Sequence, residues 1–165
     1  MTGIVQTLRA LQHFPATLRA FLNDVPSAAV DWRPASWDGV PSEALTVRQQ
    51  ICHLRDIEID GYQIRFDRLL NEPSPVLASL DTDALVVARR YDETDLEEAL
   101  QAFEAARRHT VARLVTLMPE DLAAAGTFEG YGPVTVRGLI HYLCSHDQQH
   151  LAGIQWLAGQ FCSHH

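Results

Sequence analysis

The sequence predicts an all-α protein, a four-helix bundle with a long connection between its second and third helices. Two observations support this fold class. Four long segments repeat apolar residues every three or four positions, as in a helix with one buried face, and hardly any stretch alternates as a strand does. The chain has 165 residues, about the length of one compact domain, so residues 1–165 are expected to form a single bundle.

The first two segments form the N-terminal half of the expected bundle. Apolar residues recur from Ile4 to Leu22, although Pro15 lies within this stripe and is expected to kink or divide the helix. The second segment is expected to begin at Thr46, where Thr-Val-Arg-Gln matches a capping box, and to run to about Asn71. Its apolar face carries Leu54, Ile57, Gly61 and Ile64.

The other two segments complete the bundle. The third is expected to begin at Thr94, in a second capping box, and to end at Met118, because Pro119 follows. The fourth is expected to run from near Thr135 to near Gly159, a residue type that often stops a helix. Four amphipathic helices of similar length bury their apolar stripes most simply in a bundle, and the long second connection favours a crossover over simple hairpins.

Composition and charge exclude several classes of function. Thirteen Lys and Arg residues against 21 Asp and Glu residues give a formal net charge of -8, so no basic face is available for a phosphate backbone or an anionic membrane. We therefore expect no nucleic-acid partner and no membrane partner. The start of the chain does not resemble an export signal, and the three cysteines fit a reducing compartment, which predicts a cytoplasmic protein. The closing His164 and His165 are given no functional weight.

Histidines occupy positions that the helical period assigns to the core. On the fourth helix the apolar stripe places His146 and His150 inward, one turn apart, which is the spacing of H-E-x-x-H zinc sites. A single inward histidine is more often a hydrogen-bonded core residue, but two on one helix face favour metal binding. His53, at the edge of the apolar stripe of the second helix, is the best-placed third ligand.

The remaining histidines and cysteines are poorer ligand candidates. His141 lies about 140° round the fourth helix from its inward face. His13 and His109 are expected to be solvated surface imidazoles. Cys52 and Cys144 neighbour the candidate ligands in sequence but lie off their faces, so we expect them to be small buried hydrophobes.

Arg107 interrupts the apolar stripe of the third helix in the same way. An inward guanidinium needs an anion as partner. That anion is either a substrate carboxylate or a structural partner on the second helix, Glu58 or Asp60. Both alternatives stay open, with the structural pairing preferred.

Short motifs along the chain occur in the order of a known family. They are a Trp-containing approach to the second helix, then Cys-His-Leu ending at Leu54, Phe103 with Arg107 on the third helix, and His-Asp-Gln-Gln-His at 146–150. In this arrangement the chain resembles the DinB-like (DinB/YfiT) superfamily of four-helix metalloproteins over nearly its whole length. The resemblance implies a divalent metal ion, nickel or zinc, held by His53, His146 and His150. It also implies a metal-dependent enzyme that uses a small thiol such as bacillithiol or mycothiol.

The surroundings of the three histidines agree with a catalytic ion. Three neutral imidazoles leave open coordination positions, unlike the closed sites of structural metals. Gly153, one turn beyond the last ligand, is expected to leave room beside the ion, and Tyr142 is expected to line the mouth of the site. Asp56 is either a hydrogen-bond acceptor that orients the ring of His53 or, the somewhat preferred alternative, a solvated surface carboxylate.

The favoured function is a thiol S-transferase, in which the metal activates a low-molecular-weight thiol for attack on a small electrophile. Two alternatives stay open, because no nucleophile or general base identifies itself: a non-catalytic protein that binds a metal or small ligand, and a metal-dependent hydrolase or isomerase. The expected partners are a small-molecule substrate, such as a thiol, and a second copy of the chain in a homodimer.

Overall fold

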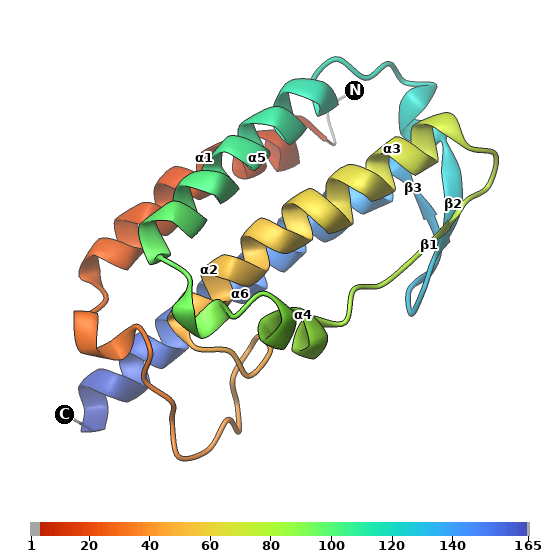
Figure 1. Ribbon diagram of the computed structural model, residues 1–165. Coiled ribbons are helices and arrows are strands. Elements are labelled where there is room, and N and C mark those ends of the chain that lie inside the picture. The colour runs from red at the N-terminus through yellow and green to blue at the C-terminus, as the bar shows by residue number, and fades with distance from the viewer. Residues whose placement is uncertain (1–3, 165) are drawn as a thin grey trace.

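The computed structural model describes residues 4–164 as a helical bundle with a small sheet at one end (Figure 1). The long helices are α1 (Val5–Asp24), α2 (Val47–Asp56), which continues through the π-helical segment η2 (Ile57–Gln63) into α3 (Ile64–Asn71), α5 (Leu96–Leu114) and α6 (Val136–His164). The short elements are α4 (Thr82–Ala88), the 3-10 turns η1 (Ser27–Ala29), η3 (Tyr91–Glu93) and η4 (Asp121–Ala123), and the strands β1 (Val76–Leu77), β2 (Ala125–Phe128) and β3 (Gly132–Thr135). The helical bundle is confirmed, and the strands make the all-α description approximate. Residues 1–3 and His165 lie outside the described residues.

The bundle contains the crossover that the long second connection favours. Both α1 and α2 pack against α5 and α6, so the first two long helices lie diagonally across the bundle. The rod formed by α2, η2 and α3 runs in the same direction as α5 (Figure 1). The connection between them therefore has to return along the length of the bundle, and it carries β1 and α4 on the way.

The two predicted capping boxes have different outcomes. The first is present, because Thr46 Oγ1 accepts a hydrogen bond from the Gln49 amide at 3.3 Å and Gln49 Oε1 accepts one from the Thr46 amide at 3.0 Å. The second prediction is wrong by one residue. Asp95, not Thr94, caps α5, and its Oδ1 accepts from the Glu98 amide at 2.9 Å.

Three predicted features of the helices differ in the structure. Pro15 does not divide α1, which continues through it. The helix α5 ends at Leu114 instead of Met118, because the amides of Thr116 and Leu117 bond to carbonyls three residues back and tighten the chain out of the α-helical path. Gly159 does not end α6, which runs on to His164. A glycine stops a helix when it takes a positive φ, and Gly159 is not among the residues that do so.

The segment η2 shifts the buried face of the second helix. The predicted stripe is buried as far as Gly61, but Ile64 is 49% exposed, whereas Arg65 and Phe66 are buried. A π-helical turn bonds residues five apart and so takes up more residues than an α-helical turn. Its insertion rotates the residues that follow, and an arginine takes the inward position that the α-helical period gives to isoleucine.

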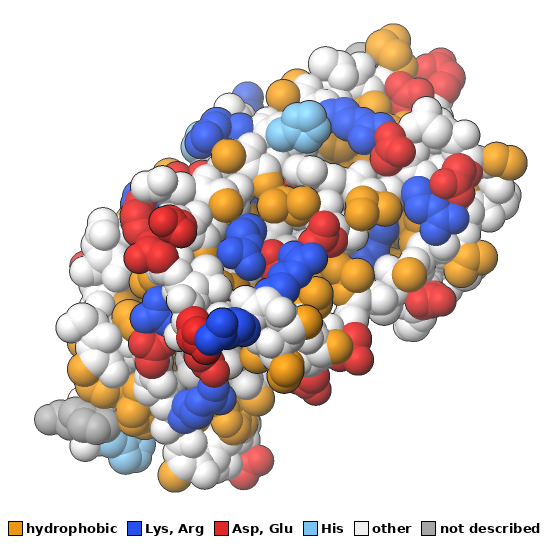
Figure 2. Space-filling view, viewed as in Figure 1, with side chains coloured by type: hydrophobic (Ala, Val, Ile, Leu, Met, Phe, Trp, Pro, Cys, Tyr) orange, Lys and Arg blue, Asp and Glu red, His pale blue; other side chains and the backbone are white. Residues whose placement is uncertain are grey.

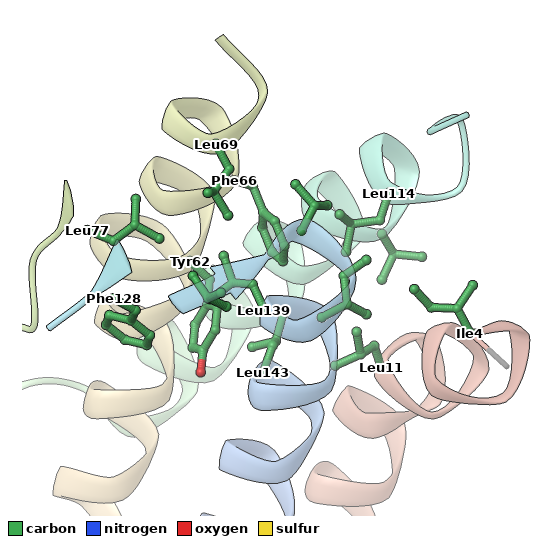
Figure 3. Close-up of a cluster of buried hydrophobic side chains, with 14 of the residues drawn as sticks. Ile4, Leu11, Tyr62, Phe66, Leu69, Leu77, Leu114, Phe128, Leu139 and Leu143 are labelled. Atoms are coloured by element: carbon green, nitrogen blue, oxygen red, sulfur yellow. The ribbon is translucent and has the colours of Figure 1, made fainter. Parts of the chain in front are cut away.

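A three-stranded sheet closes one end of the bundle. The strand β2 pairs in parallel with β1 and antiparallel with β3. These strands have two to four residues, too few for an alternating pattern to stand out in the sequence. Leu77 and Phe128 lie beside Tyr62 in the core, so the sheet extends the apolar interior (Figure 3).

A layer of polar residues separates two apolar clusters. One cluster, at the sheet end, includes Leu11, Phe66 and Leu143 (Figure 3), and the other includes Phe14 and Phe103. Between them along the helices lie buried polar side chains: His53, Glu58, Arg107, Asp147 and His150. Buried polar groups need partners, so this layer is where the sequence departs from simple core packing.

The surface carries mixed charge. Figure 2 shows Arg side chains interspersed with Asp and Glu on the face it presents. Several of these charges are paired, for example Arg19 with Glu97 and Glu104. Within residues 4–164, no helix combines the length and the apolar character needed to cross a bilayer.

Candidate metal centre

The three predicted ligands meet in the polar layer, between α2 and α6. The ring centroids are 5.2 Å apart for His53 and His146, 4.6 Å for His53 and His150, and 4.4 Å for His146 and His150. One ligand nitrogen from each ring lies within 4.8 Å of the others. The packing of α2 against α6 thus brings together residues almost a hundred positions apart in the sequence (Figure 1).

Two nitrogen atoms of these three rings have no hydrogen-bond partner within the described part of the chain. His53 Nδ1 and His150 Nε2 are buried, and neither has a hydrogen bond to any described residue. His53 Nε2 and His146 Nε2 lie 3.2 Å apart, at hydrogen-bond distance when one of the two rings carries its proton there. An unpartnered buried polar atom destabilises a fold by about 1–3 kcal/mol, whereas a divalent ion satisfies several imidazole lone pairs at once. The residues present therefore fit a divalent metal ion.

The protonation state of the histidines suits metal binding. Burial lowers the pKa of His53 to about 4, although the charge of Asp56 opposes the shift. Burial also holds the pKa values of His146 and His150 well below the ordinary range, and the neighbouring histidines add to the shift. All three rings are neutral near pH 7, which is the form that binds a metal.

A hydrogen-bonded chain orients His150. Its Nδ1 is bonded to Gln50 Oε1, and Gln50 Nε2 donates to Ser42 Oγ at 2.7 Å and to the Leu45 carbonyl at 3.4 Å. Because an amide oxygen only accepts, His150 carries its proton on Nδ1. Its Nε2 lone pair is thereby free for a metal ion.

Gly153 makes room for this chain. A Cβ at Gly153 would overlap Ser42 Oγ and lie 2.7 Å from Gln50 Nε2. The expectation that Gly153 leaves space beside the ion is therefore corrected: its missing side chain accommodates the residues that hold His150. The loop before α2 approaches α6 at this point, and no helical period describes that approach.

Removing the acceptor of His150 is expected to weaken metal binding. Gln50→Ala should lower the affinity for a divalent ion by about 10- to 100-fold, because the ring loses the bond that fixes its orientation and tautomer. Competition with a chromophoric chelator measures this change. Gln63→Ala is the matched control, since Gln63 bonds to Ala106 and Thr110 away from the histidines. Equal affinities for the two variants would contradict the role of Gln50.

A cavity of about 110 Å³ opens beside the ligands. His53 and His146 form part of its wall, and His146 is only partly buried. Glu43 also lines it, and its Oε2 lies 3.2 Å from His150 Nε2. The cavity therefore lies against two of the three candidate ligands. The other lining residues are Ile57, Tyr62, Arg65, Ser79, Leu80, Thr82, Phe128 and Tyr131.

Tyr142 does not line this cavity. Its ring packs instead against Tyr131, with centroids 5.1 Å apart, and Tyr131 is the tyrosine that borders the cavity. The prediction for Tyr142 is therefore wrong. The prediction used only the position of Tyr142 one helical turn before His146 on α6. The loop between β2 and β3 instead brings Tyr131 to the cavity.

Neither alternative for Asp56 is correct. The carboxylate is buried and accepts hydrogen bonds from Tyr91 Oη at 2.6 Å and Arg55 Nε at 2.7 Å, with Arg89 at 2.9 Å. It makes no hydrogen bond to His53, whose Nδ1 is unpartnered. Burial alone would raise the pKa of Asp56, but the hydrogen bonds from Arg55 and Tyr91 outweigh it and hold the pKa below its ordinary value. Asp56 ties α2 to the segment that precedes α5.

Arg107 has structural partners, as the preferred alternative expects. Its guanidinium forms paired hydrogen bonds with Glu58 at 2.8 and 3.1 Å and with Asp147 at 2.6 and 2.9 Å, and it donates to the Leu11 carbonyl at 3.3 Å. These bonds use all five N–H donors, which leaves none for a substrate carboxylate. Asp60, the other proposed partner, belongs to a different ion pair. The Arg107 side chain connects α5 to η2, α6 and α1.

Pro15 explains why the Leu11 carbonyl is available. A proline has no amide hydrogen, so the carbonyl four residues before it receives no helical hydrogen bond. Arg107 supplies a donor to that carbonyl. Pro15, which was expected to kink or divide the helix, instead leaves the Leu11 carbonyl free to accept a hydrogen bond from the buried Arg107 side chain.

The histidines set aside in the sequence lie on the surface. His13, His109 and His141 are exposed, as expected. Cys52 is fully buried, and Cys144 is partly buried against the core. The places of these side chains agree with the expectations from helical phase.

Three residues of the site were missed. Gln50 lies on the buried face of α2, and a buried glutamine three residues before a candidate ligand is a signal that could have been found. Asp147 stands within the His-Asp-Gln-Gln-His motif, but its partner lies on another helix. Glu43 comes from an irregular loop, where no period indicates which residues face inward.

The chain is similar to known proteins over most of its length. Among solved structures it resembles YfiT from Bacillus subtilis, described as a probable metal-dependent hydrolase with an unusual four-helix bundle topology. The TM-score is 0.81 and the sequence identity is 21%, and the match covers 94% of this chain and 86% of that one. No curated protein matches the sequence. The model of the DinB superfamily matches residues 10–154, a span that includes all three candidate ligands. The chain therefore belongs to the DinB superfamily.

Proposed function

We propose that this protein is a metal-dependent enzyme in which His53, His146 and His150 hold a divalent ion, nickel or zinc, next to a small-substrate cavity. The observation that carries the proposal is the meeting of three imidazoles, with no hydrogen bond from the described residues at His150 Nε2, next to a cavity that His53 and His146 line. A closed site with four protein ligands would favour a structural ion, whereas three imidazoles and a partly exposed His146 favour a catalytic one.

The residues around the cavity suit activation of a small nucleophile. A divalent ion at this place would lower the pKa of a thiol or of water and so supply a nucleophile near neutral pH. Gln50 keeps His150 in the required tautomer. The carboxylate of Glu43, 43% exposed at the edge of the site, is placed to accept the proton that the nucleophile loses.

Thiol transfer is the favoured reaction, on the strength of the resemblance to thiol-dependent members of the superfamily. In this reaction the thiol gives up its proton, its sulfur forms a bond to an electrophilic carbon, and the leaving group departs with the electron pair. A small cavity next to the ligand nitrogens suits the thiol end of such a cosubstrate. The homodimer and the cytoplasmic location stay predictions.

The thiol reaction can be tested directly. Metal-loaded protein should accelerate conjugation of at least one of glutathione, bacillithiol and mycothiol to monochlorobimane, because coordination raises the thiolate fraction near neutral pH. The fluorescence of the product measures the rate, and metal-free protein is the control. If none of these thiols reacts faster with the metal-loaded form, the transferase assignment loses its support.

Metal-dependent hydrolysis is the second candidate. The carboxylate of Glu43 beside His150 Nε2 favours it, since hydrolysis needs a base for water. YfiT is described as a probable metal-dependent hydrolase, which is the same class of reaction. Ester and amide substrates, tested without thiol, distinguish it from transfer. Metal binding without either activity would favour the non-catalytic alternative.

A further inference from the structure

Arg65 places a buried cation in the wall of the candidate active cavity. It lies on α3, its side chain is only 5% exposed, and it lines the same cavity as His53 and His146. Burial of a guanidinium is costly unless an anion compensates its charge. No carboxylate among the described residues forms an ion pair with Arg65.

The partners of Arg65 are all neutral. Nε and Nη2 donate to the Ala78 carbonyl at 3.1 and 2.9 Å, and the guanidinium carbon lies 4.5 Å from the ring centroid of Phe128 and 5.3 Å from that of Tyr62. Figure 3 shows that these two rings lie next to each other in the core. Nη1 forms no hydrogen bond with the described residues. The carbonyl and the rings position the head group without neutralising it.

The fold makes specific room for this head group. A Cβ at Gly61 would lie 2.8 Å from Arg65 Nη1, so only a glycine fits there without displacing the guanidinium. The π-helical segment η2 contains Gly61 and turns Arg65 inward while Ile64 faces solvent. Both features serve to bring an arginine into the cavity wall.

Arg107 shows what a structural arginine in this protein looks like. It is buried to a similar degree, but two carboxylates and a carbonyl use all of its donors. Arg65 has a free amino group and an uncompensated charge. Glu43 is the one acidic residue of the cavity lining, and it approaches His150 instead. The described part of the protein therefore supplies no anion to compensate the charge of Arg65 in this cavity.

We infer that Arg65 is a specificity-determining residue that receives the carboxylate of a small anionic substrate whose reacting end lies at the three histidines. The inference rests on the proposed metal site and adds a substrate class to it. A planar guanidinium with a free amino group matches a carboxylate, and the volume of about 110 Å³ limits the bound part of the substrate to a few heavy atoms. A short mercaptocarboxylate meets both conditions.

The test compares an acidic thiol with its neutral ester. Wild-type protein and Arg65→Met are loaded with Co²⁺, and 3-mercaptopropionate or its methyl ester is titrated while the sulfur-to-cobalt absorption is followed. Arg65→Met should bind the acid at least about 10-fold more weakly than wild type, because a hydrogen bond to a charged group is lost, and should bind the ester within about 3-fold of wild type. Arg65→Lys should recover part of the affinity for the acid.

Matched controls separate this inference from the metal site. Arg113→Met removes a similar charge from an exposed pair with Asp67 and should leave both affinities unchanged. Melting temperatures verify that each variant folds. The inference is wrong if Arg65→Met weakens the binding of the acid and of the ester equally. It is also wrong if the preference for the acid over the ester is no larger in wild type than in Arg65→Met. In both cases the metal site stands.

A second measurement needs no metal. In metal-free protein, propionate should raise the melting temperature of wild type more than that of Arg65→Met, and propionamide should raise neither. Failure of Co²⁺ to bind wild type would refute the proposed metal site alone. Equal effects of propionate on both proteins would refute the role of Arg65.

Discussion

Replacing any one of His53, His146 and His150 by alanine should lower the affinity for a divalent ion by orders of magnitude. Two imidazoles hold a metal far less well than three, and each ring contributes a ligand nitrogen to the same small volume. Wild type should bind one ion per chain, and the ion should raise the melting temperature because it binds only the folded state. Elemental analysis and metal titration measure stoichiometry and affinity.

Two surface histidines provide the controls for this experiment. His13→Ala and His109→Ala remove exposed rings and should leave metal binding intact. Full occupancy in His53→Ala would show that α2 contributes no ligand. A wild-type protein that binds nothing after reconstitution with nickel or zinc would contradict the metal centre as a whole.

Replacing Arg107 by methionine should destabilise the fold by about 3–5 kcal/mol, because it leaves two buried carboxylates without a counter-charge. Glu58 and Asp147 are each 1% exposed. Burial already raises the pKa of Asp147 to about 6 although Arg107 opposes the shift, so the site has little solvent to stabilise a lone charge. Urea denaturation followed by circular dichroism measures the free energy of unfolding.

Two further variants test the reason for this loss. Arg113→Met breaks an exposed ion pair with Asp67 and should change the free energy of unfolding by less than about 1 kcal/mol. Combining Arg107→Met with Glu58→Leu and Asp147→Leu should recover much of the lost stability, because no buried charge is left. If the melting temperature of Arg107→Met stays within a few degrees of wild type, the structural role of Arg107 is contradicted and its role in binding a substrate is favoured.

The sequence by itself determined the bundle and which histidines are candidate metal ligands, because helical phase is a local property. The stripes of apolar residues locate the long helices, and Thr46 marks the start of α2 by a capping box confined to four residues. Phase also separates His146 and His150, which face the interior, from His141, which does not. Positions set by the 3.6-residue period need no knowledge of the rest of the fold.

Only the tertiary structure decided which side chains partner one another. Asp147 meets Arg107 from a different helix, and Ser42 reaches Gln50 from a loop, so sequence distance carries no information about either contact. The period itself failed after η2, where a wider turn placed Arg65 inside and Ile64 outside. The candidate metal ligands follow from the local pitch of helices. Their hydrogen-bond partners and the cavity depend on how helices and loops pack, which is a property of the whole chain.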